Sequence, residues 1–270
     1  MNRFSALLRE QNLEALKQQA ASGDSKAQFD LGMMYAKGEG VPKDQTQAAA
    51  WYRKAAEHGD PRGQLCLGGQ YYYGLGVPQD HTQAAEWYLK AAVQGEREAQ
   101  RLLGYLHYRG DGVPRNYAQA AAWYCHAAVQ DDHAAQRLLG DLHYFGRGVP
   151  QDYVHALLWF RKAVEQGNLT AQLSLGYLYS TGRGVPQDYA EAYFWFEIAH
   201  VSSKEIRQAD PLQFLMGFRV DVPIACKLET VDLASMEDRD IAASNLTPAD
   251  LSCIQERVRK WFEDHPAKPR

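Results

Sequence analysis

The sequence predicts an all-α protein, a right-handed α/α superhelical solenoid of antiparallel helix pairs. Two observations predict this fold: a block of residues recurs with a period of 36 residues, and each period holds two stretches with the apolar spacing of an amphipathic helix. Five such repeats occupy residues 27–203 without a change of register. Because one helix pair of this length cannot bury both of its apolar faces, the repeats are expected to stack on one another.

The first helix of each repeat is predicted from a stripe of apolar residues. In the first copy, Ala27, Leu31 and Tyr35 follow one another at intervals of four residues and share one face of a helix. A glycine comes directly after the leucine in every copy, at Gly32, Gly68, Gly104, Gly140 and Gly176. Since glycine inside a helix costs about 1 kcal/mol relative to alanine, its recurrence indicates the close approach of a neighbouring helix backbone.

A G-x-G-V-P block is expected to end the first helix. The first glycine suits a left-handed helix cap, and the proline cannot continue a helix. The second helix is expected to begin after an Asp or Asn N-cap, at Asp44, Asp80, Asn116, Asp152 and Asp188. Its predicted buried face in the first copy consists of Ala48, Trp51, Tyr52 and Ala55.

The two ends of the repeat array are expected to be capped. Residues 13–24 align with the second helix of a repeat, so residues 1–26 are assigned to an N-terminal capping helix. Residues 204–270 are assigned to a C-terminal insert and capping helices. Within them, the apolar segment 204–235 either covers the last repeat or is mobile and docks elsewhere. A short helix is expected near 236–243, and a T-P-A-D sequence predicts a final helix over about 248–264.

Composition and charge exclude several classes of partner. The 270 residues carry a formal net charge of -4, so no general positive field attracts nucleic acid or an acidic membrane surface. The first twenty residues lack the uncharged core of a secretory signal, and no stretch reaches the roughly 18 apolar residues of a membrane span. These features predict a cytoplasmic protein that neither binds nucleic acid nor inserts into a membrane.

The repeated pattern resembles the Sel-1-like repeat, a relative of the tetratricopeptide repeat. It reads A-Q-x-x-L-G-x-x-Y-x-x-G-x-G-V-P-x-D-x-x-x-A-x-x-W-Y-x-K-A-A-x-x-G and is almost complete from Ala27 to Gly59. The resemblance implies a superhelix that acts as an adaptor for protein complexes, often in bacteria, and it supplies no catalytic residues. One cysteine-rich branch is reported to bind or hydrolyse penicillin-like compounds, but the paired cysteines of that branch are missing here.

A candidate partner-binding surface lies on the first helices, opposite the alanine–leucine stripe. The residues there are mostly tyrosine and arginine, which are enriched among interface hot spots. They are Arg101, Tyr105, Tyr108, Arg137, Asp141, Tyr144 and Tyr177. By analogy with tetratricopeptide repeats, we expect them to face solvent on the concave side, with Arg101 and Arg137 meeting acidic groups of an extended or helical partner segment. The alternative is that some of the tyrosines pack against the following turn.

Three classes of function are compatible with the sequence. The first is a protein–protein interaction scaffold without enzymatic activity, cofactor or metal, present as a monomer or weak homodimer. The second is a hydrolase-like or metal-dependent enzyme that uses His107, His143 and Asp141, although both histidines fall in a tyrosine column of the core, where a hydrogen bond to a neighbouring tyrosine is the simpler role. The third is a structural protein that self-associates through exposed tyrosines.

Overall fold

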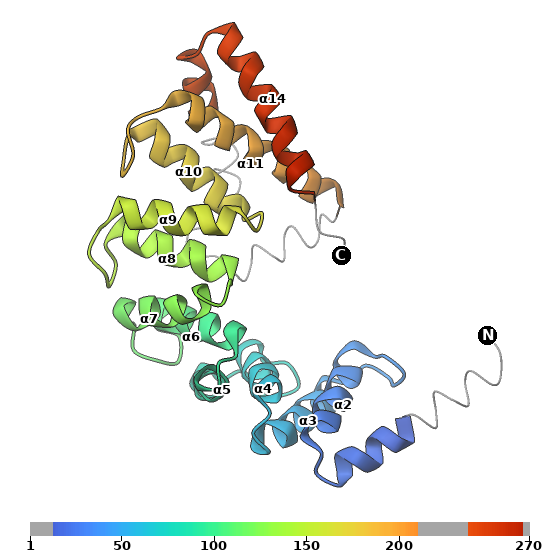
Figure 1. The fold of residues 1–270 in the computed structure, drawn as a ribbon. Helices are drawn as coiled ribbons and strands as arrows, with labels where there is room; N and C mark the ends of the chain where they lie inside the picture. Colours follow the sequence, from blue (N-terminus) through green and yellow to red (C-terminus); the bar gives the residue numbers. More distant parts are fainter. Residues whose placement is uncertain (1–12, 210–236, 267–270) are drawn as a thin grey trace, which may run out of the picture. The chain divides into compact units, whose positions relative to one another are not determined.

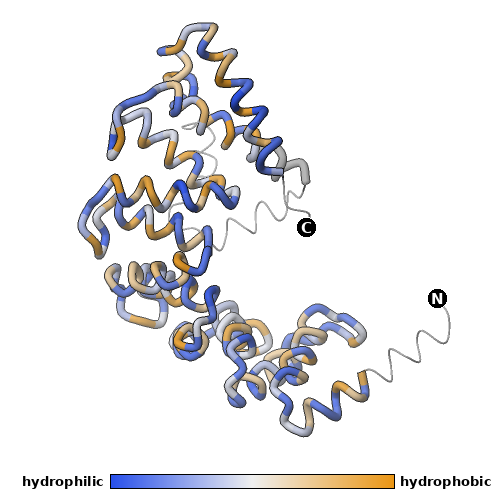
Figure 2. Tube along the Cα trace, viewed as in Figure 1, coloured by the Kyte–Doolittle hydropathy of each residue, from blue (hydrophilic) through white to orange (hydrophobic). Residues whose placement is uncertain are grey.

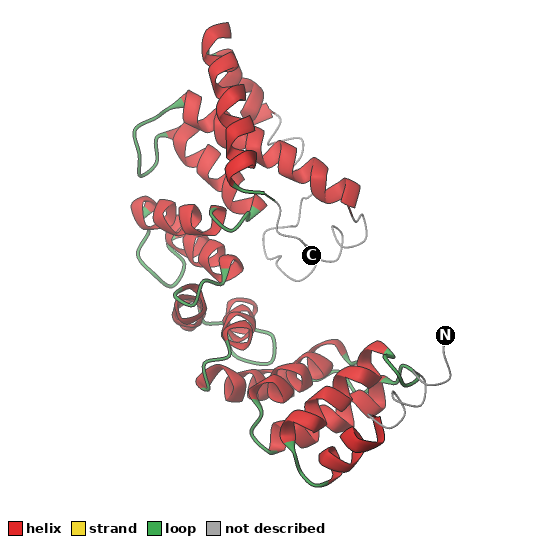
Figure 3. Ribbon diagram, turned by 45° about the vertical axis from the view of Figure 1, so that its right-hand side comes forward, coloured by secondary structure: helices red, strands yellow, loops and turns green. Residues whose placement is uncertain are grey.

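The computed structural model describes residues 13–209 and 237–266, and every regular element within these ranges is a helix (Figures 1 and 3). The chain forms two compact units, Met1–Gln130 (unit 1) and Asp131–Arg270 (unit 2). Hydrophilic and hydrophobic residues alternate along the helices of both units, as amphipathic helices require (Figure 2). The predicted all-α repeat fold is confirmed.

Unit 1 contains a helix over residues 13–21 followed by three helix pairs. The pairs are α2 (Ser25–Lys37) with α3 (Gln45–Glu57), α4 (Pro61–Tyr73) with α5 (His81–Val93), and α6 (Arg97–Arg109) with α7 (Tyr117–Ala128). Within this unit, α3 also packs on α4, and α5 packs on α6. The helix over residues 13–21 packs on the first pair, because its Ala20 is buried together with Ala27 and Leu31 of α2.

Unit 2 contains two further pairs and the C-terminal cap. The pairs are α8 (His133–Phe145) with α9 (Tyr153–Val164), and α10 (Leu169–Thr181) with α11 (Tyr189–Ala209). A helix over residues 237–244 leads to α14 (Pro248–Asp264), which begins with a capping box between Thr247 and Asp250 as predicted. Ile254 and Val258 of α14 cover Phe194 and Ile198 of α11. Most of the segment 204–235 lies outside the described residues.

The recurring glycine of the first helix makes room for an aromatic ring. A Cβ atom added to Gly68 would lie 2.6 Å from Cδ1 of Tyr88, and one added to Gly140 would lie 2.6 Å from Cε1 of Phe160. The expected close approach is therefore real, but a side-chain ring rather than a backbone makes it. The five buried rings are Tyr52, Tyr88, Tyr124, Phe160 and Phe196.

The tryptophan of the second helix is only half-buried, so its predicted burial is correct only in part: Trp51 packs against the buried Ala20, Ala27 and Leu31 but keeps one side exposed. The adjacent Tyr52, which the sequence also predicts on this face, is 2% exposed and fills the core. A lysine three residues further on covers the tryptophan from outside: Nζ of Lys54 lies 3.9 Å from the centre of the Trp51 ring. Lys90 covers Trp87 in the same way at 3.7 Å.

The G-x-G-V-P turn ends each first helix as predicted. Gly38 adopts the left-handed conformation, with φ of 79°, and its N–H donates to the carbonyl of Met34. The second glycine allows the turn to lie on the preceding repeat, because a Cβ on Gly184 would come within 2.6 Å of the backbone of Tyr153. The expected N-caps are also present, and Asp44 accepts hydrogen bonds from two backbone N–H groups.

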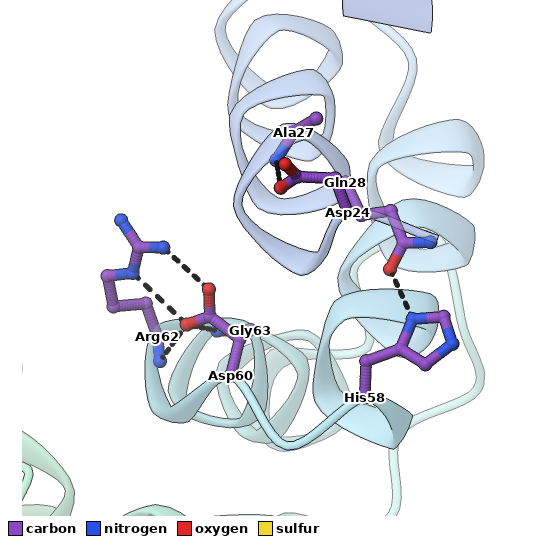
Figure 4. Close-up of polar contacts among 7 residues, drawn as sticks. All are labelled: Asp24, Ala27, Gln28, His58, Asp60, Arg62 and Gly63. Carbon is purple, nitrogen blue, oxygen red and sulfur yellow. Dashed lines mark hydrogen bonds and ion pairs between the residues drawn. The ribbon is translucent and has the colours of Figure 1, made fainter. Parts of the chain in front are cut away.

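A buried glutamine in each first helix of unit 1 joins it to the neighbouring second helices. Nε2 of Gln28 donates to the carbonyl of Ala20, and its Oε1 lies 2.8 Å from Nδ1 of His58 (Figure 4). In the next repeat, Gln64 donates to Ala56 and accepts a hydrogen bond from Gln94. Gln100 makes the same two contacts, with Ala92 and Gln130, so in unit 1 the Ala-Gln column of the sequence is a column of hydrogen bonds between adjacent helices. In the described ranges, no helix is both long and apolar enough to cross a membrane.

Candidate partner-binding surface

In unit 1, the three predicted residues of α6 are half-buried rather than solvent-facing. Nη2 of Arg101 lies 3.5 Å from Oε1 of Glu98 on the same helix. The ring of Tyr108 packs edge to face on Tyr117, with 5.2 Å between ring centres. Tyr105 packs against the buried cluster formed by α5 and α6. Tyr108 therefore packs against the segment that follows its turn, which is the alternative that the sequence left open for these tyrosines.

In unit 2, Arg137 is buried, and the prediction that it faces solvent is wrong. Its side chain retains 4% of its exposure, and Nη1 lies 2.5 Å from Oδ2 of Asp141 one turn further along α8. Burial raises the pKa of Asp141 to about 6, while Arg137 and Arg147 act in the opposite direction. A partner could reach Arg137 only by breaking this buried pair, so we assign the pair to the fold rather than to a binding surface.

Four side chains of unit 2, from helices α8, α9 and α10 and from the turn after α10, form the tyrosine–arginine cluster: Tyr144, Tyr153, Tyr177 and Arg183. Tyr144 lies edge to face with Tyr153 and with Tyr177, with ring centres 5.3 and 6.4 Å apart. The guanidinium carbon of Arg183 lies 5.7, 5.5 and 5.9 Å from the ring centres of Tyr144, Tyr153 and Tyr177. Arg183 also donates a hydrogen bond to the Tyr144 hydroxyl.

The cluster is accessible to solvent on one side. Tyr177 is 39% exposed and Arg183 is exposed, whereas Tyr144 and Tyr153 are half-buried beneath them. Burial raises the pKa of Tyr144 and Arg183 lowers it. A guanidinium group has five N–H donors, so the hydrogen bond to Tyr144 leaves most donors of the exposed Arg183 unused. The cluster therefore combines an exposed aromatic surface with a positive charge that has unused hydrogen-bond donors.

Sequence reasoning identified Tyr144 and Tyr177 but missed the other half of the cluster. Arg183 stands between the two glycines of a G-x-G-V-P turn, and Tyr153 opens the second helix of the preceding repeat. They meet because the turn lies on that helix, which the position of Gly184 against Tyr153 makes possible. The signal available in the sequence was the variation at the position between the glycines, where the frame is otherwise constant.

Another arginine–tyrosine contact occurs in unit 2, away from the cluster. Nη2 of Arg161 in α9 donates to the hydroxyl of Tyr179 in α10, and Arg161 is exposed. In unit 1, Arg53 makes the equivalent bond to Tyr71 at 2.6 Å. These pairs connect consecutive repeats, and each involves a single tyrosine ring. Arg161 therefore provides a matched control for Arg183.

The histidines considered for catalysis have other surroundings than predicted. The ring of His143 stacks on His155, with 5.4 Å between centres, while the carboxylate of Asp141 is bound to Arg137. Nδ1 of His107 and Nδ1 of His143 are buried without a hydrogen-bond partner among the described residues. Each ring has a hydrogen bond with a proline backbone instead, at Pro114 for His107 and at Pro150 for His143. The expected bond to a tyrosine is thus not the one found. Across the described residues, no three His, Cys, Asp or Glu side chains are placed to hold a metal.

Comparison with known proteins agrees with this geometry. The Sel1 repeat model matches residues 25–60, 61–96, 97–132, 133–168 and 169–199. The chain belongs to the Sel1 repeat family. Proteins with Sel1 repeats generally mediate protein–protein interactions, and the fold is generally a non-enzymatic scaffold. The matched segments correspond to the five helix pairs of the two units.

Two solved structures share the Sel1 repeat fold with this chain. One is a protective antigen of uropathogenic Escherichia coli, with 44% identity and a TM-score of 0.69 over 70% of this chain and 41% of the antigen. The other is a Sel1 repeat protein from Oxalobacter formigenes, with 32% identity and a TM-score of 0.67 over 74% of this chain and 85% of that protein.

A curated relative is the secretory immunoglobulin A-binding protein EsiB of Escherichia coli O6:H1. It is 54% identical over 44 residues, which amount to 16% of this chain and 9% of EsiB. This chain therefore spans less than half of the length of EsiB and of the uropathogenic antigen that it matches.

Proposed function

We propose that this Sel1 repeat protein is a scaffold that binds a partner protein through the tyrosine–arginine cluster of unit 2. The observation that carries the proposal is the exposure of Tyr177 and Arg183 above two half-buried tyrosines. Tyrosine and arginine are the side chains that contribute most to interface hot spots. The other predicted residues are less accessible, since Arg137 is buried and Arg101, Tyr105 and Tyr108 are half-buried.

Rigidity of the cluster also supports the proposal. Tyr144 and Tyr177 stand on the packed helices α8 and α10, and Arg183 is held by contacts with three rings. Side chains that are already ordered lose little conformational entropy when a partner binds, so more of the contact energy appears as affinity. The name of EsiB states that it binds secretory immunoglobulin A, which supports protein binding as the class of function without naming a partner for this chain.

Affinity capture tests the proposal. We expect the purified chain to capture a specific protein from a lysate of the source organism, and the double variant Tyr177→Ala/Arg183→Ala to lose most of it. The control, Leu158→Ala/Arg161→Ala, removes one exposed apolar residue and one exposed arginine from α9 in the same unit. Equal capture by both double variants and the wild type would contradict binding at the cluster.

Self-association would give a different result in the same variants. If the exposed tyrosines join two copies of the chain, the mass measured by light scattering rises with the concentration of the wild type and not with that of Tyr177→Ala/Arg183→Ala. We expect a constant mass for both proteins over the concentration range. If the mass rises with concentration in the wild type alone, the cluster joins two copies of the chain, and the proposal that it binds another protein is wrong.

A further inference from the structure

We infer that the tyrosine–arginine cluster recognises an acidic segment of the partner protein, with Arg183 binding a carboxylate. This inference rests on the proposed function and states the chemistry of the partner. It replaces the sequence-based expectation that Arg101 and Arg137 meet the acidic groups, because both of those side chains are paired with carboxylates of their own helices. Arg183 makes no ion pair with any residue that the structure describes.

The contacts of Arg183 leave its charge unneutralised but hold its position. Its described interactions are one hydrogen bond to a neutral hydroxyl and three contacts with ring faces. Tyr144 is neutral near pH 7, because a tyrosine hydroxyl ordinarily has a pKa of about 10 and burial raises the pKa of this one. A guanidinium group fixed in this way presents a planar set of donors to solvent, which is the geometry that binds a carboxylate with two parallel hydrogen bonds.

Two acidic residues flank members of the cluster in the sequence, Asp152 before Tyr153 and Asp188 after Arg183, and neither forms an ion pair with Arg183. Oδ1 of Asp152 accepts hydrogen bonds from two backbone N–H groups at the start of α9, and Oδ2 of Asp152 binds His155. Oδ1 of Asp188 accepts two equivalent bonds at the start of α11. Both carboxylates therefore serve as helix caps, and an external carboxylate is the complementary group for Arg183.

A second arginine lies beside the cluster. The guanidinium carbon of Arg147 lies 4.9 Å from the ring centre of Phe145, and that ring packs edge to face on Tyr144 at 4.8 Å. Phe145 is 46% exposed. Arg147 and Arg183 thus lie over adjacent aromatic rings, so the partner segment is expected to combine acidic residues with apolar ones.

A single-stranded nucleic acid also binds to surfaces of aromatic and arginine side chains. Such binding depends on a broad positive field along the backbone, whereas this chain has a net charge of -4. An acidic protein segment needs only a local positive group next to apolar surface. The charge of the whole chain therefore favours the protein segment, and nucleic acid becomes an outcome of the test.

Selection from a random library of twelve-residue peptides displayed on phage tests the inference. We expect the wild-type chain to select peptides richer in Asp and Glu than the unselected library. The variant Arg183→Glu should bind the selected peptides at least about tenfold more weakly, the loss of a modest hot spot. The matched control Arg161→Glu reverses the charge of another exposed, tyrosine-bonded arginine of the same unit and should bind them as the wild type does.

The outcomes separate this inference from the proposed function. If Tyr177→Ala abolishes peptide binding while Arg183→Glu leaves it unchanged, the surface is correct and recognition of a carboxylate is wrong. If neither variant affects binding of the selected peptides, or if a single-stranded oligonucleotide displaces them, both ideas fail at this surface. If the wild-type chain selects peptides without enrichment in Asp and Glu, the inference is overturned. Circular dichroism should show unchanged helix content in each variant whose binding is compared.

Discussion

Equivalent turns of the two units carry opposite charges on the same frame. In unit 1, the turn residue is Asp111, whose negative charge adds to the effect of burial in raising the pKa of Tyr72. Nε of Arg109 lies 3.4 Å from Oδ2 of Asp111. Two repeats later, in unit 2, the equivalent turn residue is Arg183 and the equivalent ring is Tyr144. Burial raises the pKa of both tyrosines, but Asp111 raises that of Tyr72 further while Arg183 lowers that of Tyr144.

This comparison separates the residues that build the repeat from those that distinguish one repeat from another. The glycine under the buried ring and the buried glutamine have the same role in both units. The residue between the two turn glycines changes its charge without changing the turn, because its side chain lies at the surface. Loops placed by a rigid frame are where binding specificity usually resides.

The largest difference in stability between the units should come from the buried ion pair of unit 2. Replacing Arg137 by leucine leaves the Asp141 carboxylate buried without its partner, and we expect a loss of about 3 kcal/mol in the free energy of unfolding. In unit 1, Arg101 pairs with Glu98, whose side chain is 56% exposed, so Arg101→Leu should cost less than about 1 kcal/mol. Urea denaturation followed by circular dichroism measures both values.

A double variant provides the control for this prediction. Arg137→Leu combined with Asp141→Tyr copies Leu173 and Tyr177, the residues that the next repeat has at these positions. It should recover most of the stability lost in Arg137→Leu, because no charge is left buried alone. If the double variant is as unstable as the single one, the pair is not the source of the loss.

The next effect should be equal in the two units. Gly68→Ala and Gly140→Ala each place a methyl group 2.6 Å from a buried ring, on Tyr88 in unit 1 and on Phe160 in unit 2. Overpacking of this kind costs roughly 2 kcal/mol, and thermal unfolding should show a similar decrease for both variants. A decrease in one unit only would mean that the two units do not share the same packing.

The third effect concerns pH and should be smaller. Burial lowers the pKa of His107 in unit 1, so its stabilising contribution is complete above the unfolded pKa of about 6.5 and decreases as the pH falls below it. His143 of unit 2 acts in the same direction. Asp141 acts in the opposite direction, because its raised folded pKa of about 6 makes protonation favour the folded state on acidification.

Acidification from pH 7 to pH 5 should therefore destabilise unit 1 more than unit 2. Hydrogen exchange followed by mass spectrometry, corrected for the intrinsic exchange rates, reads the two units separately. His107→Tyr, which restores the residue found at Tyr35 and Tyr71, should reduce the pH dependence in unit 1. Equal pH dependence of both units in the wild type would contradict these assignments.

The sequence predicted the frame because the frame depends on local rules. Helix caps at Asp44 and its equivalents, left-handed glycines such as Gly38 and the final helix from Thr247 all follow from contacts within a few residues. The sequence predicts burial of both Trp51 and Tyr52, because adjacent aromatic residues lie on neighbouring parts of the same helical face. Only Tyr52 is fully buried, because its ring packs on the glycine of the first helix.

The candidate site was only partly predictable, because it depends on contacts between repeats. The pairing of Arg137 with Asp141 follows from their spacing of four residues, but their burial depends on the packing of the whole unit. Arg183 and Tyr153 are thirty residues apart in the sequence and meet only because the turn of one repeat lies on the preceding one. The periodicity of the sequence predicts the helices, but it does not predict that Arg183 of one turn contacts the ring of Tyr153 in the preceding repeat.

The most direct test measures the affinity of the captured partner for two variants, Arg183→Asp and Asp111→Arg. Arg183→Asp gives the turn of unit 2 the charge of the equivalent turn in unit 1, and Asp111→Arg makes the reverse change. We expect the first substitution to increase the dissociation constant at least about tenfold, and the second to leave it within about twofold of the wild-type value. An unchanged affinity for Arg183→Asp, in a protein with unchanged thermal stability, would contradict the assignment of partner binding to this turn.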